Sequence, residues 1–180
     1  MATYISILRG INVSGKKKIL MADLRALYES LGFTNVRTYI QSGNVIFESN
    51  TKESDAAKVQ KIATAITEKY GFEVPIMLRT AAEFEAVINT NPFFKEDNVD
   101  PKKLYITFLA ERPTAENLAK LADVNYPPDQ FQLIGKTIFL YCEKYGRTKL
   151  SNTFFERKLK VTATTRNWKT VNKLFALAMG

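Results

Sequence analysis

The sequence predicts an α+β protein built from two ferredoxin-like subdomains, each with the element order βαββαβ. Stretches with apolar residues at every third or fourth position alternate with β-branched, aromatic runs. In each half, two β-rich runs follow one another across a short turn that contains glycine, which indicates an antiparallel hairpin. Because hairpins interrupt the strand–helix alternation of a parallel sheet, two small lobes fit the pattern better than one doubly wound sheet.

The first subdomain is predicted over residues 1–80. A β-branched run at Thr3–Arg9 predicts the first strand, and the spacing of leucines in Met21–Leu31 predicts a helix that ends at Gly32. The remaining predicted elements are the hairpin strands Asn35–Gln41 and Val45–Glu48, a helix from Ser54 to Gly71, and a strand at Phe72–Arg79. On the first hairpin strand, Arg37, Tyr39 and Gln41 stand at a spacing of two, which predicts one shared polar face or a plain solvent face.

Residues 81–101 are predicted to form a connector helix and linker, and residues 102–180 a second ferredoxin-like subdomain with an extra C-terminal helix. Thr80 and Glu83 have the spacing of a capping box, which opens the connector helix. The predicted elements after it are Lys103–Leu109, Thr114–Ala122, Phe131–Ile134, Thr137–Cys142, Leu150–Leu159, Val161–Thr165 and a final helix from Trp168 to Ala178.

The composition excludes several kinds of chemistry. Among 180 residues there is no histidine, so the chain cannot supply a Ser-His or Cys-His pair or a histidine-ligated metal, and we expect neither a metal nor a cofactor. Cys142 is the only thiol and ends an apolar strand, which favours an inert core thiol. No stretch approaches the ~20 apolar residues that span a bilayer, so we expect a cytoplasmic protein with no membrane partner.

The positive charge is concentrated near the C-terminal end. Of the 26 Lys and Arg residues, nine lie between Lys144 and Lys173, where Glu156 is the only acid, and the rest of the chain is neutral. Such a segment is typical of a surface that binds nucleic acid or phosphate, although it is equally consistent with a solvated face.

Two motifs resemble nucleotide- or RNA-binding patterns without matching them. The stretch from Gly10 to Lys16 has the GxxxxGK spacing of a phosphate-binding loop, but Lys17 offers no hydroxyl for Mg²⁺ and the helix begins late, near Met21. The glycine-rich turn and its lysines could still hold an anion. The hairpin segment 43–48 lacks the aromatic pattern of RNA-recognition strands, which makes an RNA-recognition function weakly supported.

Five segments together resemble a widespread bacterial family of unknown function: LRGINV from Leu8, TYIQSGNV from Thr38, NPF from Asn91, GRTKL from Gly146 and TRNW from Thr165. The resemblance covers nearly the whole chain and implies a compact α+β protein of two ferredoxin-like subdomains, with no known substrate, cofactor or catalytic residue. The chain departs mildly from the family at Ser14 and Thr148. The family-like polar positions, which form our candidate ligand-binding set, are Arg9, Asn12, Tyr39, Gln41, Ser42, Asn44, Arg147, Lys149, Arg166 and Asn167.

The leading hypothesis from sequence is a protein that binds an anionic ligand, either nucleic acid or a phosphorylated small molecule. The loops after Gly10 and Gly146 each follow a predicted strand, so they are predicted to meet at one basic cleft that includes Arg9, Asn12, Arg147, Lys149 and Arg166. An enzyme without histidine or metal chemistry, using Tyr39, Lys149 or a carboxylate, and a protein-interaction module are the alternatives. The sequence assigns no catalytic residue and no oligomeric state.

Overall fold

The computed structural model describes all 180 residues and divides into two units. The first unit comprises Met1–Phe84 and Leu174–Gly180, and the second comprises Glu85–Lys173. The boundaries fall inside helices α3 (Ala81–Asn89) and α6 (Trp168–Ala178), whereas the predicted boundaries follow residues 80 and 101.

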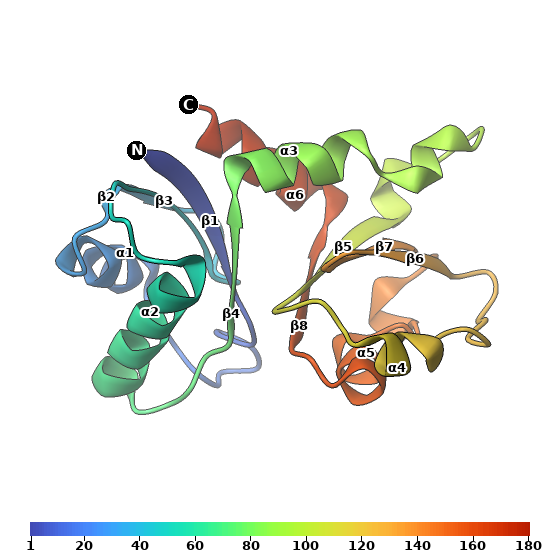
Figure 1. Cartoon of the computed structure of the whole chain (residues 1–180), viewed down its shortest axis with the longest axis horizontal. Coiled ribbons are helices and arrows are strands. Elements are labelled where there is room, and N and C mark those ends of the chain that lie inside the picture. The colour runs from blue at the N-terminus through green and yellow to red at the C-terminus, as the bar shows by residue number, and fades with distance from the viewer. The chain divides into compact units, whose positions relative to one another are not determined.

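The first unit has the ferredoxin-like arrangement that the sequence predicts. Its antiparallel sheet has the strand order β2-β3-β1-β4, and α1 and α2 cover one face of this sheet (Figure 1). The elements are β1 (Ala2–Leu8), α1 (Met21–Ser30), β2 (Thr34–Thr38), β3 (Asn44–Ser49), α2 (Asp55–Tyr70) and β4 (Ile76–Thr80).

An aromatic cluster forms the centre of the first unit's core. The Phe47 ring of β3 lies 4.4 Å from the Phe33 ring and 5.5 Å from the Tyr4 ring, measured between centroids. Tyr28 meets Phe47 edge-on, and its buried hydroxyl shares a 2.7 Å hydrogen bond with Ser6 Oγ. The core therefore accepts a phenol because β1 supplies a polar partner for it.

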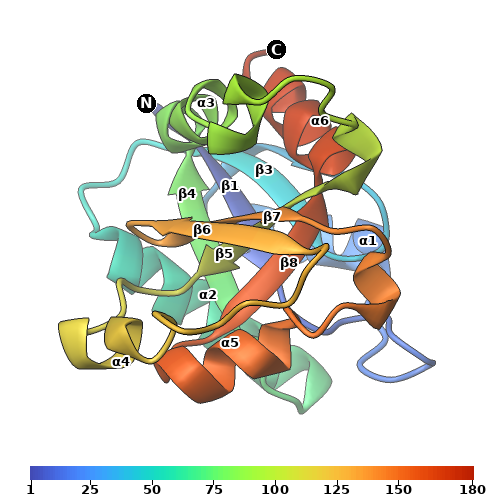
Figure 2. The ribbon, with the colours of Figure 1, turned by 90° about the vertical axis from the view of Figure 1, so that its right-hand side faces the viewer.

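The second unit repeats this arrangement with different residues. Its sheet has the order β6-β7-β5-β8, and Figure 2 shows β6 as the edge strand beside β7. Apolar residues of α5 pack with those of β5 and β7. The elements are β5 (Leu104–Leu109), α4 (Ala115–Ala119), β6 (Gln130–Ile134), β7 (Thr137–Tyr141), α5 (Asn152–Leu159) and β8 (Ala163–Asn167), with short 3₁₀ turns at Pro92–Lys95, Pro101–Lys103 and Tyr145–Arg147.

The capping box at the start of α3 is confirmed. The Glu83 carboxylate accepts from the backbone N–H of Thr80 over 2.7 Å, and the Thr80 hydroxyl accepts from the N–H of Glu83 over 3.2 Å. Two N–H groups that a helix start leaves without helical partners are thus satisfied by each other's side chains.

The predicted strand Asn35–Gln41 is wrong at its end, because β2 stops at Thr38. Ile40 has a φ of 53°, a left-handed conformation that breaks the alternation of a strand. Tyr39 and Gln41 therefore lie in the turn, and the predicted shared sheet face with Arg37 does not form. The predicted strand Phe72–Arg79 is also too long, since β4 begins at Ile76.

No helix in the chain combines the length and the apolar character needed to cross a membrane.

Candidate functional site

The second unit contains a groove of about 330 Å³ that carries two of the predicted site residues, Arg147 and Lys149. We call it the Arg147–Lys149 groove. Its lining consists of Asn125, Tyr126, Pro127, Pro128, Asp129, Arg147 and Lys149.

Thr148 lies between the two cations and faces the other way. Its backbone is extended, with φ of −70° and ψ of 147°, directly after the 3₁₀ turn that ends at Arg147. The Thr148 hydroxyl donates to Asp129 Oδ2 over 2.6 Å and accepts from the N–H of Leu150 over 3.2 Å. Thr148 therefore turns toward the protein, while Arg147 and Lys149 remain exposed.

Asp129 is the one acid in the lining, and two hydrogen bonds engage its carboxylate. Its Oδ1 accepts from the backbone N–H of Glu143 over 3.1 Å, and its Oδ2 accepts from Thr148. No carboxylate lies within ion-pair distance of Arg147 or Lys149. The lining consequently carries two positive charges against the single negative charge of Asp129, and neither cation is held in an ion pair.

Tyr126 positions one of these charges. The Nζ atom of Lys149 lies 5.2 Å from the centroid of the Tyr126 ring, within the range of a cation–π interaction. The same ring meets the buried Phe154 ring edge-on at 5.8 Å, so it is anchored to the core of the second unit. The ammonium group is thus held at the groove by an aromatic ring that cannot move freely.

Cys142 lies behind the Thr148 segment and is no nucleophile at neutral pH. Its Sγ donates weakly to the Thr148 hydroxyl over 3.8 Å. Burial, with a smaller contribution from the negative charge of Asp129, raises the pKa of the Cys142 thiol to about 11, although the hydrogen bond with Thr148 lowers it in part. The thiol is therefore protonated near pH 7, in agreement with the inert core thiol that the sequence predicts.

Arg166 and Asn167 lie in the second unit outside the groove lining. The Arg166 guanidinium donates to the Thr164 hydroxyl over 3.1 Å and to the Thr165 carbonyl over 3.0 Å, and burial lowers its pKa to about 10. Asn167 Oδ1 accepts from the N–H of Thr170 over 2.8 Å, which caps the start of α6. These two side chains already have structural partners.

In the first unit, the Asn12 side chain joins two loops. Its Nδ2 donates to the carbonyls of Ile19 (3.0 Å) and Gln41 (2.8 Å), and its Oδ1 accepts from the N–H of Ile19 (2.9 Å). Both amide hydrogens are thereby used within the protein. Asn12 fixes the loops on which other predicted residues lie, and a ligand would have to break one of these bonds to contact its amide hydrogens.

The loop with the GxxxxGK spacing is a small hairpin. The N–H of Lys16 donates to Val13 O over 2.9 Å, the N–H of Asn12 donates to Lys17 O over 3.1 Å, and the two turn residues Ser14 and Gly15 have φ of 50° and 73°. Positive φ at both central positions is the pattern of a type I′ turn. A two-residue hairpin turn is not the wide loop that wraps a phosphate, which agrees with the rejection of a nucleotide-hydrolysing loop.

Ser42 and Asn44 build the turn between β2 and β3. The buried Asn44 donates from Nδ2 to the Tyr39 carbonyl over 2.9 Å and to the Ser42 hydroxyl over 3.1 Å. Gly43 between them packs closely, because a Cβ there would lie 2.7 Å from Ile11 Cδ1. The sequence motif in this loop therefore encodes a turn.

Arg9 also belongs to the first unit. It follows β1 directly, and its backbone N–H donates to Pro75 O over 3.0 Å. Because Arg9 and Arg147 are in different units, their predicted common cleft stays a prediction.

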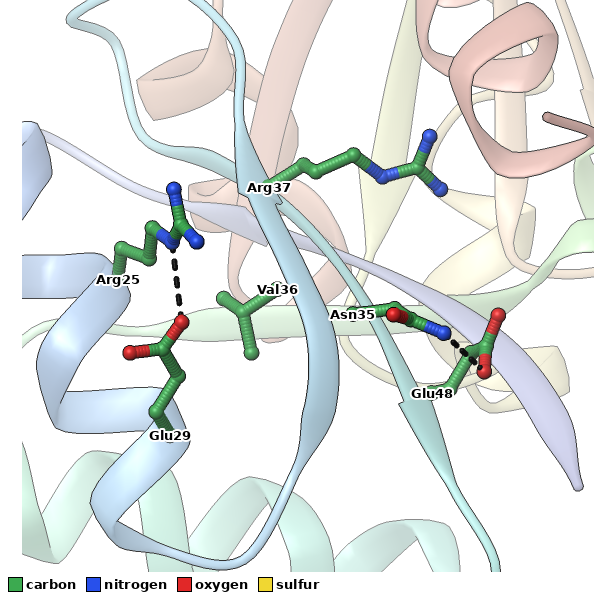
Figure 3. Close-up of a pocket in the computed structure, with 6 residues that line it drawn as sticks. All are labelled: Arg25, Glu29, Asn35, Val36, Arg37 and Glu48. Atoms are coloured by element: carbon green, nitrogen blue, oxygen red, sulfur yellow. Dashed lines mark hydrogen bonds and ion pairs between the residues drawn. The ribbon is translucent and has the colours of Figure 1, made fainter.

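A hollow of about 620 Å³ in the first unit, between α1 and β2, carries balanced charge (Figure 3). Arg25 pairs with Glu29 at 3.0 Å, and Asn35 donates to Glu48 over 2.8 Å. Arg37 projects away from the Arg25–Glu29 pair in Figure 3. With two arginines and two glutamates around it, this hollow selects less strongly for an anion than the Arg147–Lys149 groove.

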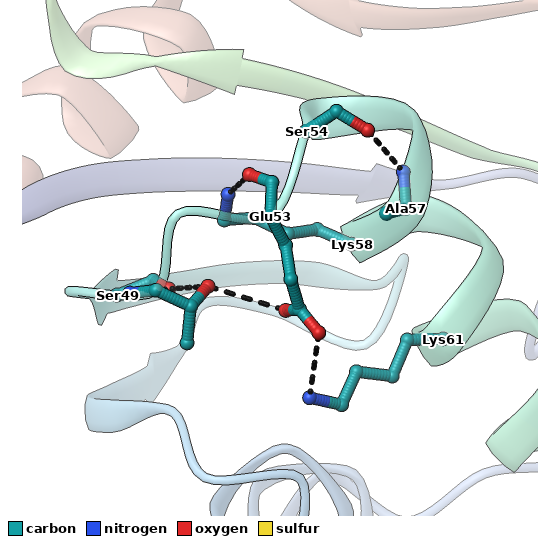
Figure 4. A network of polar contacts seen from close by, with 7 residues as sticks. Ser49, Glu53, Ser54, Ala57, Lys58 and Lys61 are labelled. Carbon is teal, nitrogen blue, oxygen red and sulfur yellow. Dashed lines mark hydrogen bonds and ion pairs between the residues drawn. The ribbon is translucent and has the colours of Figure 1, made fainter.

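Lys58 is a buried lysine at the start of α2 (Figure 4), with 1% of its surface exposed. Its Nζ donates to the backbone carbonyl of Glu53 and lies 5.1 Å from the centroid of the Tyr4 ring. The Glu53 side chain pairs in turn with Lys61 at 3.5 Å. This network secures the first turn of the helix, and the absence of access from solvent argues against a reactive amine.

No group of three His, Cys, Asp or Glu side chains is placed so that it could hold a metal ion.

Comparison with known proteins identifies the family. A family model described as "Protein of unknown function (DUF1697)" matches residues 1–139. The chain belongs to this family. No curated protein matches it. The solved structure of the conserved bacterial protein SP0830 from Streptococcus pneumoniae is similar, with a TM-score of 0.79, 26% sequence identity and coverage of 98% of both chains.

The DUF1697 match covers only one of the two segments that form the groove, whereas the structural match covers nearly the whole chain. The family model ends at residue 139, so it includes Tyr126 and Asp129 but stops before Arg147 and Lys149. The SP0830 structure extends the likeness in fold over nearly the whole chain.

The other five residues of the groove lining, 125–129, are not among the residues predicted from sequence. They form an Asn-Tyr-Pro-Pro-Asp segment ahead of β6, where an aromatic residue and an acid beside two prolines are the signal of a fixed loop. The charge run alone pointed to Arg147 and Lys149, but nothing in the sequence paired that run with a segment about twenty residues earlier.

Proposed function

We propose that this DUF1697 protein binds a phosphorylated small molecule in the Arg147–Lys149 groove. The observation that carries the proposal is that two cations without an acidic partner line one groove of about 330 Å³. A guanidinium offers paired N–H donors to phosphate oxygens, and an ammonium adds a second charge from another direction.

The size of the groove favours a small ligand over nucleic acid. A volume of about 330 Å³ is at the lower end of the range for pockets that hold small molecules. Nucleic acid is bound by a track of several cations along the backbone, whereas two cations line this groove. The exposed amide of Asn125 is available to contact the part of the ligand that carries the phosphate.

The chemistry of the groove favours binding over catalysis. The chain has no histidine, and the nearby Cys142 is protonated at neutral pH because its pKa is raised to about 11. The carboxylate of Asp129 is engaged by two donors that hold the loops together. The Asp129 carboxylate thus has a structural use in the groove, and the Cys142 thiol keeps its proton at pH 7.

The proposal is tested with inorganic phosphate, a hexose monophosphate, a nucleoside monophosphate and a mixed-sequence oligonucleotide, each titrated by calorimetry. We expect saturable binding of at least one phosphorylated small molecule at low salt. The double variant R147Q/K149Q should weaken that binding at least about a hundredfold, because each of the two charge-assisted contacts that it removes contributes about 1.5–3 kcal/mol.

The matched control is K169Q/K173Q, which removes the same charge from exposed positions of α6 outside the groove. It should bind like the wild type. Equal loss in both double variants would mean that net charge and not the groove attracts the anion, and binding of the oligonucleotide alone would overturn the small-molecule ligand.

A further inference from the structure

The β6 edge of the second sheet lacks the features that protect the other sheet edges. The four edge strands of the two sheets are β2 and β4, and β6 and β8. β2 pairs irregularly between Thr34 and Arg37, with a left-handed Asn35 (φ 49°), while β4 contains Arg79 and β8 contains Arg166. Bulges and charges of this kind discourage pairing with a further strand. β6, with the sequence Gln-Phe-Gln-Leu-Ile, has neither.

The register fixes which backbone groups β6 leaves open. β6 and β7 pair without interruption from Gln130–Tyr141 to Ile134–Thr137, across the two-residue turn Gly135–Lys136. The pair that closes such a turn exchanges both hydrogen bonds, and hydrogen bonding alternates along an antiparallel ladder. The N–H and C=O groups of Phe131 and Leu133 therefore point to the outer side, where no hydrogen bond engages them.

We propose that two copies of this chain pair through β6, strand to antiparallel strand, about a twofold axis at Gln132. This inference is independent of the groove. In that register Phe131 of one copy lies opposite Leu133 of the other. The N–H and C=O groups of Phe131 in each strand then form hydrogen bonds with the C=O and N–H groups of Leu133 in the other strand. Both side chains are half-buried on the apolar face of the sheet, so pairing covers the rest of their surface.

The ends of the strand are complementary as well. β6 contains no charged residue, so no like charges oppose one another along it. It is preceded by Asp129 and followed by the turn with Lys136, and antiparallel pairing brings the acid of one copy next to the basic turn of the other. Ile134, which is 53% exposed, would lie against Gln130 of the second copy.

A strand of five residues gives a smaller contact than the ~1,200–2,000 Å² of stable interfaces, so we expect a dimer in exchange with monomer. Cross-linking captures such a dimer. In the proposed register the two Gln132 residues form a non-hydrogen-bonded pair with Cα atoms about 4.5 Å apart, which suits a disulfide. The two Gln130 residues are four positions out of register and roughly 14 Å apart.

The test therefore compares Q132C with Q130C under a mild oxidant. Both positions are exposed on the same face of β6, and the native Cys142 is buried. We expect Q132C to form a covalent dimer at least tenfold faster than Q130C, and urea to abolish the difference. Equal rates, or no dimer from Q132C, would overturn the proposal.

A second variant tests the backbone pairing. In the Q132C background, L133P removes an N–H that β7 does not use, so the β6–β7 ladder is retained. We expect disulfide formation to slow to the rate of Q130C, with an unchanged far-ultraviolet circular dichroism spectrum. Undiminished cross-linking in a folded L133P variant would contradict edge pairing. If this variant does not fold, sedimentation of Q132K at high concentration serves instead, and a dimer as strong as the wild type's would contradict it.

Discussion

The hydroxyl of Thr148 donates to the carboxylate of Asp129 over 2.6 Å, and this bond joins the two segments that form the Arg147–Lys149 groove. Asp129 ends the proline-containing segment before β6, and Thr148 lies in the loop after β7. Thr148 turns inward to make the bond, while Arg147 and Lys149 on either side of it are exposed. The hydrogen bond thus ties together the two segments that carry the groove lining.

Replacement of Thr148 by valine is expected to weaken both stability and binding. Valine keeps the shape but leaves Asp129 with one donor fewer, which should lower the free energy of unfolding by about 1–2 kcal/mol. Phosphate affinity should fall severalfold because Arg147 and Lys149 are no longer held. Urea denaturation and calorimetry measure the two effects. T148S keeps the hydroxyl and should bind like the wild type, and equal loss in T148S and T148V would show that the hydroxyl is not the cause.

Tyr126 should act on affinity through the position of Lys149. Y126L removes the aromatic face over which the ammonium lies at 5.2 Å, and a cation–π contact at an exposed site contributes about 0.5–1 kcal/mol. We therefore expect a two- to fivefold loss of phosphate affinity in Y126L, and none in Y126F. In a K149Q background the effect of Y126L should disappear. A loss that persists without Lys149 would mean that the ring contacts the ligand directly.

Two glycines with similar φ angles should differ in their tolerance of alanine. Gly43 has a φ of 88°, and its added Cβ would lie 2.7 Å from Ile11 and 2.8 Å from Leu8. Gly10 has a φ of 73° and nothing within 4 Å. In both variants, alanine in a left-handed conformation should lower the free energy of unfolding by about 1–2 kcal/mol. G43A should lose about 1–3 kcal/mol more, because the added Cβ overlaps with neighbouring side chains. Urea denaturation should give a clearly lower free energy of unfolding for G43A than for G10A. Equal free energies of unfolding would contradict the close packing of the turn.

Stability should fall at high pH in part because of Cys142. The thiol pKa is raised to about 11 in the folded protein, so between pH 9 and 11 the folded state holds a proton that the unfolded state releases. The thiol's contribution to the free energy of unfolding is fully present below the pKa that Cys142 has in the unfolded chain. It is lost as the pH rises toward the pKa of about 11 in the folded protein. C142A should show a flatter decline of the unfolding free energy between pH 9 and 11 than the wild type. Parallel curves would mean that the thiol keeps an ordinary pKa.

The sequence predicts the order of the elements because their signals are local. Helical spacing in Met21–Leu31, the capping box at Thr80 and the glycine turn at Gly135 each depend on a few adjacent residues, and all three are found in the structure. The end of β2 was mispredicted because the apolar alternation continues through Ile40. What ends the strand is the left-handed backbone there, beside the bond from Asn44 to the Tyr39 carbonyl.

The candidate site is less predictable from the sequence because contacts that form only in the folded chain determine what its polar residues do. Asn12, Asn44 and Asn167 were named as ligand-binding residues because they are polar and lie in motifs. Their amides instead bond to the backbone of nearby loops or cap a helix, which is a common use of asparagine at turns. Arg147 and Lys149 were found from charge, but their groove depends on Tyr126 and Asp129, which only the fold brings to them.

The most direct test of the proposed anion site is a two-dimensional ¹H–¹⁵N spectrum of the assigned protein, titrated with inorganic phosphate at low salt. The proposal predicts saturable shifts at the amides of Asn125, Tyr126, Arg147 and Lys149, with one dissociation constant, and no such shifts in R147Q/K149Q. Saturable shifts centred on Gly10–Lys18 instead, or shifts that grow linearly across all basic surfaces, would contradict it.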